Sequence, residues 1–197
     1  MTNPYWHAFY KPHLTDRGEI RRLCFDISNI ITASRSKQGS GEEYPAGEEP
    51  VPGRTEKLCF EIAEGELSRK LLRLALLIRT FDDTMVRDDA AGAYTAHRKS
   101  VDDENGPYSA VYKGNDNLAV SLRECSNKII HAEDVRPTYD TEDDRDAPHA
   151  SWGMTGALEL EGSVFGKAWD LSIQLDDYLD GVLHLIEFDD GPNALPE

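Results

Sequence analysis

Three polar side chains follow one another at intervals of four residues in the stretch SLRECSNKIIHAEDV, residues 121–135. They are Arg123, Asn127 and His131, and this spacing places them on one side of a helix. A guanidinium is always charged and matches a phosphate oxyanion, while an imidazole exchanges protons near neutral pH. An Arg and a His on one face could therefore steady a phosphate and move a proton.

The same stretch also has a structural interpretation. Five apolar or small residues fall within a narrow arc on the other side of the helix and form its core face: Leu118, Leu122, Cys125, Ile129 and Ala132. Val120 and Ile130 lie among the polar row, so we expect this second face to be covered as well. The sequence favours this interpretation, in which the row is a buried polar stripe paired with acidic loops.

Helical periodicity extends over much of the chain. Residues 19–34 repeat apolar side chains at helical intervals, and residues 55–88 form the longest such pattern, with Thr55 as N-cap. Residues 67–81 are apolar on more than one face, which is typical of a central helix. The polar row would lie on a third helix, roughly residues 117–135, stopped by Pro137.

The period changes near residue 156. Residues 157–162 and 167–175 alternate apolar and polar side chains, which predicts two strands joined as a hairpin, with Trp169 facing inward. The stretch DDYLDGVLHLIEF returns to helical spacing. We therefore predict a mainly α fold, a helical bundle-like core with a small C-terminal antiparallel β-hairpin.

One domain accounts for the 197 residues. Residues 36–54 and 138–149 combine charge with turn residues and are predicted to be exposed loops, and residues 190–197 a flexible tail. Residues 88–117 read as a polar, turn-rich connection. The N-terminus lacks a signal-peptide pattern and no stretch is apolar enough to span a bilayer, so we expect a cytoplasmic protein that does not bind membranes.

The formal net charge is −16, from 21 Lys and Arg against 37 Asp and Glu. Such a charge repels nucleic acid and attracts basic partners. The sequence thus predicts a binding or accessory protein that acts on a basic protein, as an immunity protein, an antitoxin or a nucleic-acid mimic does. The predicted binding residues are the acids that follow the third helix: Glu133, Asp134, Asp140, Glu142, Asp143, Asp144 and Asp146.

Neither a metal site nor a cofactor is predicted. The pairs Asp82–Asp83, Asp88–Asp89, Asp102–Asp103 and Asp143–Asp144 are interpreted as solvated surface, and the histidines lack ligand-like spacing. Cys24, Cys59 and Cys125 lie far apart in separate helical patterns, which argues against disulfides and for small buried side chains.

A helix that carries an Arg and a downstream His on one face, within a small helical domain, resembles the HEPN superfamily. The resemblance covers about fifteen residues, and Arg and His stand farther apart here than in the family. It implies a homodimer and a metal-independent ribonuclease, with His131 handling protons, Arg123 steadying the phosphate and Asn127 as a polar helper. Ribonuclease activity is therefore the alternative function, and RNA binding is expected only in that case.

Overall fold

The computed structural model describes residues 15–36, 54–106, 108–111, 117–139 and 153–188. Within them the chain forms five helices and one antiparallel sheet: α1 (Arg17–Ser36), α2 (Arg54–Asp88), α3 (Ala93–Asn105), β1 (Tyr108–Val111), β2 (Asn117–Val120), α4 (Leu122–His131), β3 (Asp134–Tyr139), β4 (Met154–Val164), β5 (Lys167–Gln174) and α5 (Leu175–Ile186). The mainly helical fold is thereby confirmed.

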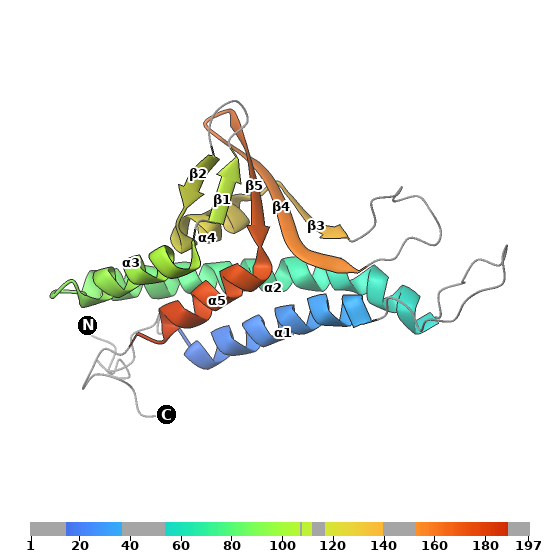
Figure 1. The fold of residues 1–197 in the computed structure, drawn as a ribbon, viewed down its shortest axis with the longest axis horizontal. Coiled ribbons are helices and arrows are strands. Elements are labelled where there is room, and N and C mark those ends of the chain that lie inside the picture. The colour runs from blue at the N-terminus through green and yellow to red at the C-terminus, as the bar shows by residue number, and fades with distance from the viewer. Residues whose placement is uncertain (1–14, 37–53, 107, 112–116, 140–152, 189–197) are drawn as a thin grey trace, which may run out of the picture.

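The helices form a layer from which the sheet rises (Figure 1). α2 is the longest element and packs along both α1 and α4, while α3 packs against α5. Buried side chains of α2 include Leu67, Leu71, Leu74 and Ile78. The predicted central helix is thus confirmed, and its apolar residues contribute to a core that reaches the sheet.

The sheet has the strand order β2-β1-β5-β4-β3. The predicted hairpin is confirmed as β4 and β5, which pair from Ala157↔Gln174 to Val164↔Lys167. Leu158 and Leu160 point inward together with Trp169, which is 2% exposed. The opposite face of these strands carries the exposed side chains Glu159 and Ser172. Two faces of opposite character are what alternation in a half-buried antiparallel sheet produces.

The predicted third helix is too long at both ends. Residues 117–120 form β2, and residues 134–139 form β3, with Pro137 inside the strand. α4 begins at Leu122 because Ser121 caps it, its side chain accepting a hydrogen bond from the Glu124 N–H at 3.2 Å. Pro137 lies on an edge strand, beside a register shift between Pro137 and Tyr139, which is where a strand tolerates proline.

Residues 88–117, predicted to be a polar connection, contain α3 and β1. α3 buries only Tyr94 and Val101, so its apolar pattern is weak. Asp89 fixes its first turn by accepting hydrogen bonds from the N–H groups of Tyr94 and Thr95 at 3.1 and 2.8 Å. The position of α3 is therefore determined by the Asp89 carboxylate and by burial of Tyr94.

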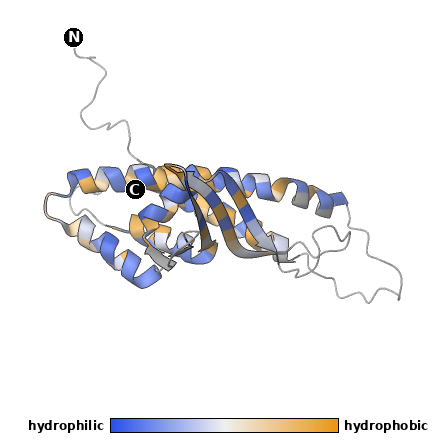
Figure 2. Cartoon of the chain, turned by 90° about the horizontal axis from the view of Figure 1, so that it is seen from above, coloured by the Kyte–Doolittle hydropathy of each residue, from blue (hydrophilic) through white to orange (hydrophobic). Residues whose placement is uncertain are grey.

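Several predictions concern residues that the structure does not describe. These residues include most of both predicted loops, the C-terminal tail, and the predicted binding residues Asp140, Glu142, Asp143, Asp144 and Asp146. Among the described helices, none is both long and apolar enough to cross a membrane. In Figure 2, hydrophobic residues (orange) form short patches along the helices between hydrophilic residues (blue).

Candidate functional site

The polar row on α4 divides into parts with different surroundings. Arg123 and Asn127 are half-buried against α2, whereas His131 at the end of the helix is exposed. The expectation that the whole row is covered is therefore wrong for His131. α4 packs most closely against α2 near Arg123, and its last turn leads out toward β3.

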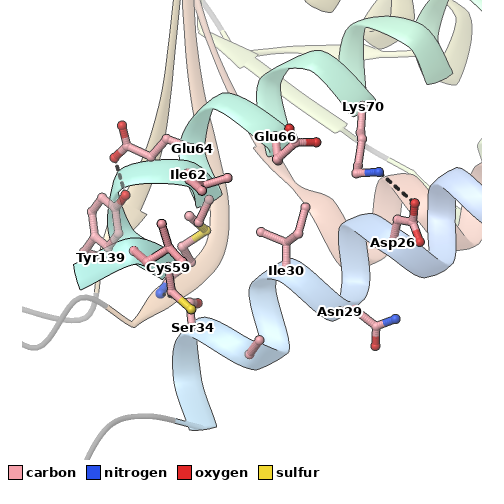
Figure 3. A pocket seen from close by; sticks show the side chains of 14 residues that line it. Asp26, Asn29, Ile30, Ser34, Cys59, Ile62, Glu64, Glu66, Lys70 and Tyr139 are labelled. Atoms are coloured by element: carbon pink, nitrogen blue, oxygen red, sulfur yellow. Dashed lines mark hydrogen bonds and ion pairs between the residues drawn. The ribbon is translucent and has the colours of Figure 1, made fainter. Parts of the chain in front are cut away.

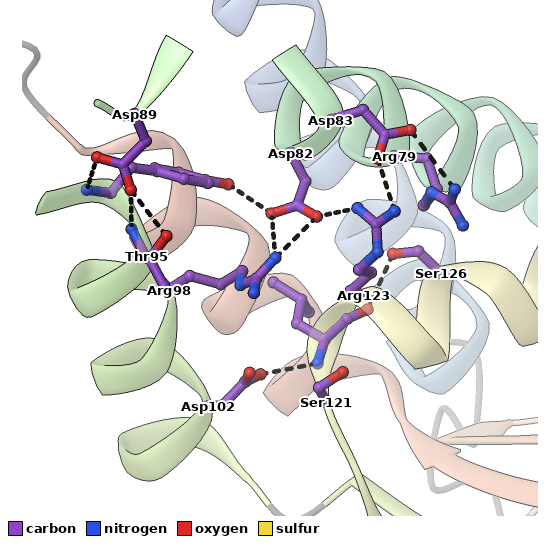
Figure 4. A network of polar contacts seen from close by, with 12 residues as sticks. Arg79, Asp82, Asp83, Asp89, Thr95, Arg98, Asp102, Ser121, Arg123 and Ser126 are labelled. Carbon is purple, nitrogen blue, oxygen red and sulfur yellow. Dashed lines mark hydrogen bonds and ion pairs between the residues drawn. The ribbon is translucent and has the colours of Figure 1, made fainter. Parts of the chain in front are cut away.

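Arg123 belongs to an ion-pair network that joins three helices (Figure 4). Its guanidinium pairs with Asp82 and, at 2.6 Å, with Asp83, both on α2. Arg98 of α3 binds both oxygens of Asp82 at 3.3 Å, and the Tyr94 hydroxyl donates to the same carboxylate at 2.9 Å. Asp82 is 1% exposed, so the interpretation of this residue as solvated surface is wrong.

The network shifts the pKa values of its members. Burial alone would raise the pKa of Asp83, but hydrogen bonds and charge from Arg123 and Arg79 outweigh it and hold this pKa below its usual value. For Arg123, burial acts to lower the pKa, and the two carboxylates reverse the shift and raise it. Burial, reinforced by the charge of Asp82, raises the pKa of Tyr94. Arg123 is thus held charged and bound to acids of its own chain.

Asn127 is also engaged. Its side-chain oxygen accepts a hydrogen bond from Arg79, and its amide donates to Glu124 at 3.3 Å. Arg79 in turn lies 3.5 Å from Asp83. Arg123 and Asn127 therefore fix α4 to α2. Their described partners lie on helices α2 and α4 rather than in the acidic loops that the structural interpretation expected, and none of these contacts involves His131.

A second arrangement of charges lies on the outer face of the sheet. Glu161 of β4 stands directly opposite Asp134 of β3 on one side and Asp170 of β5 on the other. Neighbouring strands are about 4.8 Å apart, so the three carboxylates form a row across the sheet. Glu159, two residues along β4, lies exposed on the same face.

One cation lies on this face among the described residues. Arg136 of β3 pairs with Asp134, Nε to Oδ2 at 3.2 Å, and with Glu161. Glu133 and Asp134, both predicted binding residues, are exposed at this edge of the sheet. We call Asp134, Glu159, Glu161 and Asp170 the acidic face. Like charges directly opposite one another destabilise a sheet, and Arg136 compensates two of these four carboxylates, Asp134 and Glu161.

A cavity of about 650 Å³ opens between α1, the first turns of α2 and the start of β4 (Figure 3). Its walls are largely apolar and include Ile30, Ile62 and Met154, with an ion pair from Lys70 to Asp26 at 2.7 Å. Residues 37–53 and 140–152 continue the chain from its neighbourhood and lie outside the described part. We assign no ligand to this cavity.

Other side chains of reactive types, two cysteines and two histidines, pack against neighbouring side chains of the fold. Cys24 and Cys125 are buried, and burial raises the pKa of both thiols, to about 12 for Cys24. His97 and His184 stack edge to face with ring centroids 5.2 Å apart. Within the described residues, no group of three or more His, Cys, Asp or Glu side chains could hold a metal ion.

Comparison of the chain with protein family models, with curated proteins and with solved structures finds no match. The proposals that follow therefore rest on the geometry of this chain.

Proposed function

We propose that this protein binds a basic protein partner through the acidic face, in the manner of an immunity protein or an antitoxin. The observation that carries the proposal is the row of Asp134, Glu161 and Asp170, in which each carboxylate stands opposite another across the strands. A cationic partner would neutralise this row and offset the repulsion that the free protein bears. The acidic residues at 140–146, which the sequence predicts to bind a partner, follow β3 in the chain and would add negative charge.

Ribonuclease activity has less support. In that function Arg123 would have to contact a phosphate, yet its guanidinium is already paired with two carboxylates, one of which is buried. Breaking a buried ion pair to free a charged partner is costly. The net charge of −16 also opposes RNA binding. The cytoplasm remains the proposed location, consistent with Cys24 and Cys125 as buried free thiols.

Two triple variants that remove the same number of charges test the proposal. The first, Glu159→Gln/Glu161→Gln/Asp170→Asn, neutralises most of the acidic face. The control, Glu61→Gln/Asp180→Asn/Glu187→Gln, neutralises three exposed acids on α2, on α5 and just after it. Each immobilised protein is incubated with an extract of the source cells, and the retained proteins are identified at several salt concentrations.

We expect the wild-type chain and the control to retain proteins of high isoelectric point that elute steeply with salt, because salt screens exposed charges. The first variant should lose them. Retention of the same proteins by both triple variants would contradict the proposal.

A further inference from the structure

The turn between β4 and β5 carries an aromatic side chain in a position that disfavours it. Phe165 and Gly166 form a two-residue turn with φ angles of 51° and 77°. A positive φ suits glycine and is tolerated by asparagine, but it is unfavourable for a bulky side chain. Phe165 is also fully exposed, at 101%, and Val164 next to it is 44% exposed. The tip of the hairpin therefore bears both backbone strain and exposed apolar surface.

The base of this tip is tightly packed. Gly162 lies against the Trp169 ring so closely that a Cβ on it would stand 2.4 Å from Cζ2. The Lys128 ammonium of α4 also lies over this ring, 4.3 Å from its centroid. Ser163 donates a hydrogen bond to Glu133 at 2.6 Å. These contacts hold the hairpin in place, and the turn that joins β4 to β5 lies at the end of the sheet away from α1, α2 and α5 (Figure 1).

We propose that Phe165 is the apolar anchor of the interface formed by the acidic face, and that it inserts into an apolar pocket of the basic partner. This inference rests on the proposed function. Phe165 follows Glu161 by four residues, about 13 Å along a strand. A standard interface buries about 800 Å² on each partner, which is enough to include both. At protein interfaces a few buried anchor side chains carry most of the binding energy, and the rim around them is polar.

The neighbouring charges define the chemistry of the partner. Lys167, exposed beside the turn, is one cation, but Glu159, Glu161 and Asp170 on the same hairpin outnumber it and would repel an anionic lipid surface. A second copy of this chain docking on the same surface would bring two acidic faces together. The partner that fits is a protein with Lys and Arg side chains beside an apolar pocket.

The anchor and the acidic face should affect binding differently. Phe165→Asn removes the anchor and places a residue suited to positive φ in the turn, so the melting temperature should stay the same or rise. Affinity should fall about tenfold or more, through faster dissociation. The triple variant of the acidic face should instead slow association and weaken the dependence on salt. A residue with only a structural role would not combine weaker binding with undiminished stability.

The test uses the full-length chain with the photoreactive amino acid benzoylphenylalanine at position 165, and at the exposed position Leu76 of α2 as control. After irradiation in an extract of the source cells, crosslinked proteins are identified. The captured protein is then purified, and its association and dissociation rates are measured with the wild-type chain, Phe165→Asn, the acidic-face variant and Leu76→Asn. Vesicles containing phosphatidylserine serve as the second probe.

We expect a basic protein to crosslink at position 165 and not at position 76, and to dissociate faster from Phe165→Asn alone among the single variants. The inference is overturned by the absence of a crosslinked protein, by crosslinking only to a second copy, by Phe165-dependent vesicle binding, or by unchanged rates for Phe165→Asn. If the acidic-face variant loses binding while Phe165→Asn does not, the anchor fails and the proposed function stands. If only Phe165→Asn loses binding, the acidic face fails instead.

Discussion

Asp82 and Asp83 are adjacent in the sequence, but they lie in different surroundings. Consecutive residues of a helix point about 100° apart, so Asp82 faces α3 and α4, whereas Asp83 is about half exposed. Asp82 receives two guanidinium groups and a phenol hydroxyl in a buried site, and Asp83 holds its partners at the surface. The same chemical group therefore contributes differently to stability at the two positions.

Asp82→Asn should lower the free energy of unfolding by about 3–5 kcal/mol, because it leaves Arg98 and Arg123 without the buried charge that compensates them. Asp83→Asn should have a much smaller effect, since exposed ion pairs contribute little. Urea denaturation at neutral pH, with the slope compared between variants, measures both. Equal losses for the two variants would show that the network is not centred on Asp82.

Arg123 and His131 give a related prediction about catalysis. Arg123→Ala should destabilise the protein, since it leaves Asp82 and Asp83 without one of their cations. His131→Ala should change the free energy of unfolding by less than about 0.5 kcal/mol, as is usual for an exposed residue. The purified chain should not cleave RNA in the presence of a metal chelator. Cleavage that disappears in both variants would restore the ribonuclease alternative.

At the scale of elements, the junction of β4, β5 and α4 depends on a close approach of backbone and ring. Gly162 has the Trp169 ring on one side and the His131 carbonyl oxygen 3.1 Å from where a Cβ would stand. Neither the ring, which is 2% exposed, nor a backbone carbonyl can move away easily. Any side chain at this position must displace α4 or the hairpin.

Gly162→Ala should therefore destabilise the protein by about 1–3 kcal/mol, as overpacking does. Trp169→Ala should cost about 3–5 kcal/mol through the lost core volume. In the double variant the alanine methyl group would occupy space that the ring has vacated, so the combined loss should be smaller than the sum. Thermal or urea denaturation of the four proteins measures this coupling, and strict additivity would show that the two residues do not compete for the same space.

The elements that could be predicted from the sequence are those whose apolar residues repeat over many turns or along a whole strand, namely α1, α2, α5 and the β4–β5 hairpin. α3 and the short strands could not, because they are set by contacts distant in the chain, such as Tyr94 with Asp82. A local signal was nevertheless present at α4, where Ser121 and Glu124 have the spacing of a capping box. It marks the start of that helix and would have separated it from residues 117–120.

The candidate site was predictable to a different extent. Glu133 and Asp134 were expected to bind a partner because acids cluster in that part of the chain. Glu161 and Asp170 were not, since each is an isolated acid in an alternating strand. Glu161 and Asp170 face each other across the β4–β5 hairpin, and the pairing of β3 with β4 adds Asp134 to the row. Strand register depends on contacts between distant segments, and a single sequence does not state it.

At the scale of the whole molecule, charge is distributed unequally. Arginines of α2, α3 and α4 are used inside the chain, as the pairs of Arg98 and Arg123 with Asp82 illustrate. On the outer face of the sheet, Arg136 is the one cation among the described residues, and it pairs with two of the four carboxylates, Asp134 and Glu161. Ion pairs thus balance the acids where α2, α3 and α4 meet, while the outer face of the sheet presents an excess of negative charge. Under the proposed function, the helix junction contributes stability and the outer face of the sheet contributes recognition.

The position of β5 in the sheet also determines when the protein can be completed during its synthesis. β5 is the central strand, with β1 and β4 on either side, yet it is nearly the last element of the chain. A ribosome therefore releases α1 to β4 before the strand that joins them exists, and the edge of β1 that pairs with β5, at Ala110 opposite Leu171, stays unpaired until then. Contacts between segments so distant in sequence form late and slowly. The nascent chain thus exposes an unpaired edge of β1 until β5 emerges, which is the interval in which aggregation or assistance by a chaperone would act.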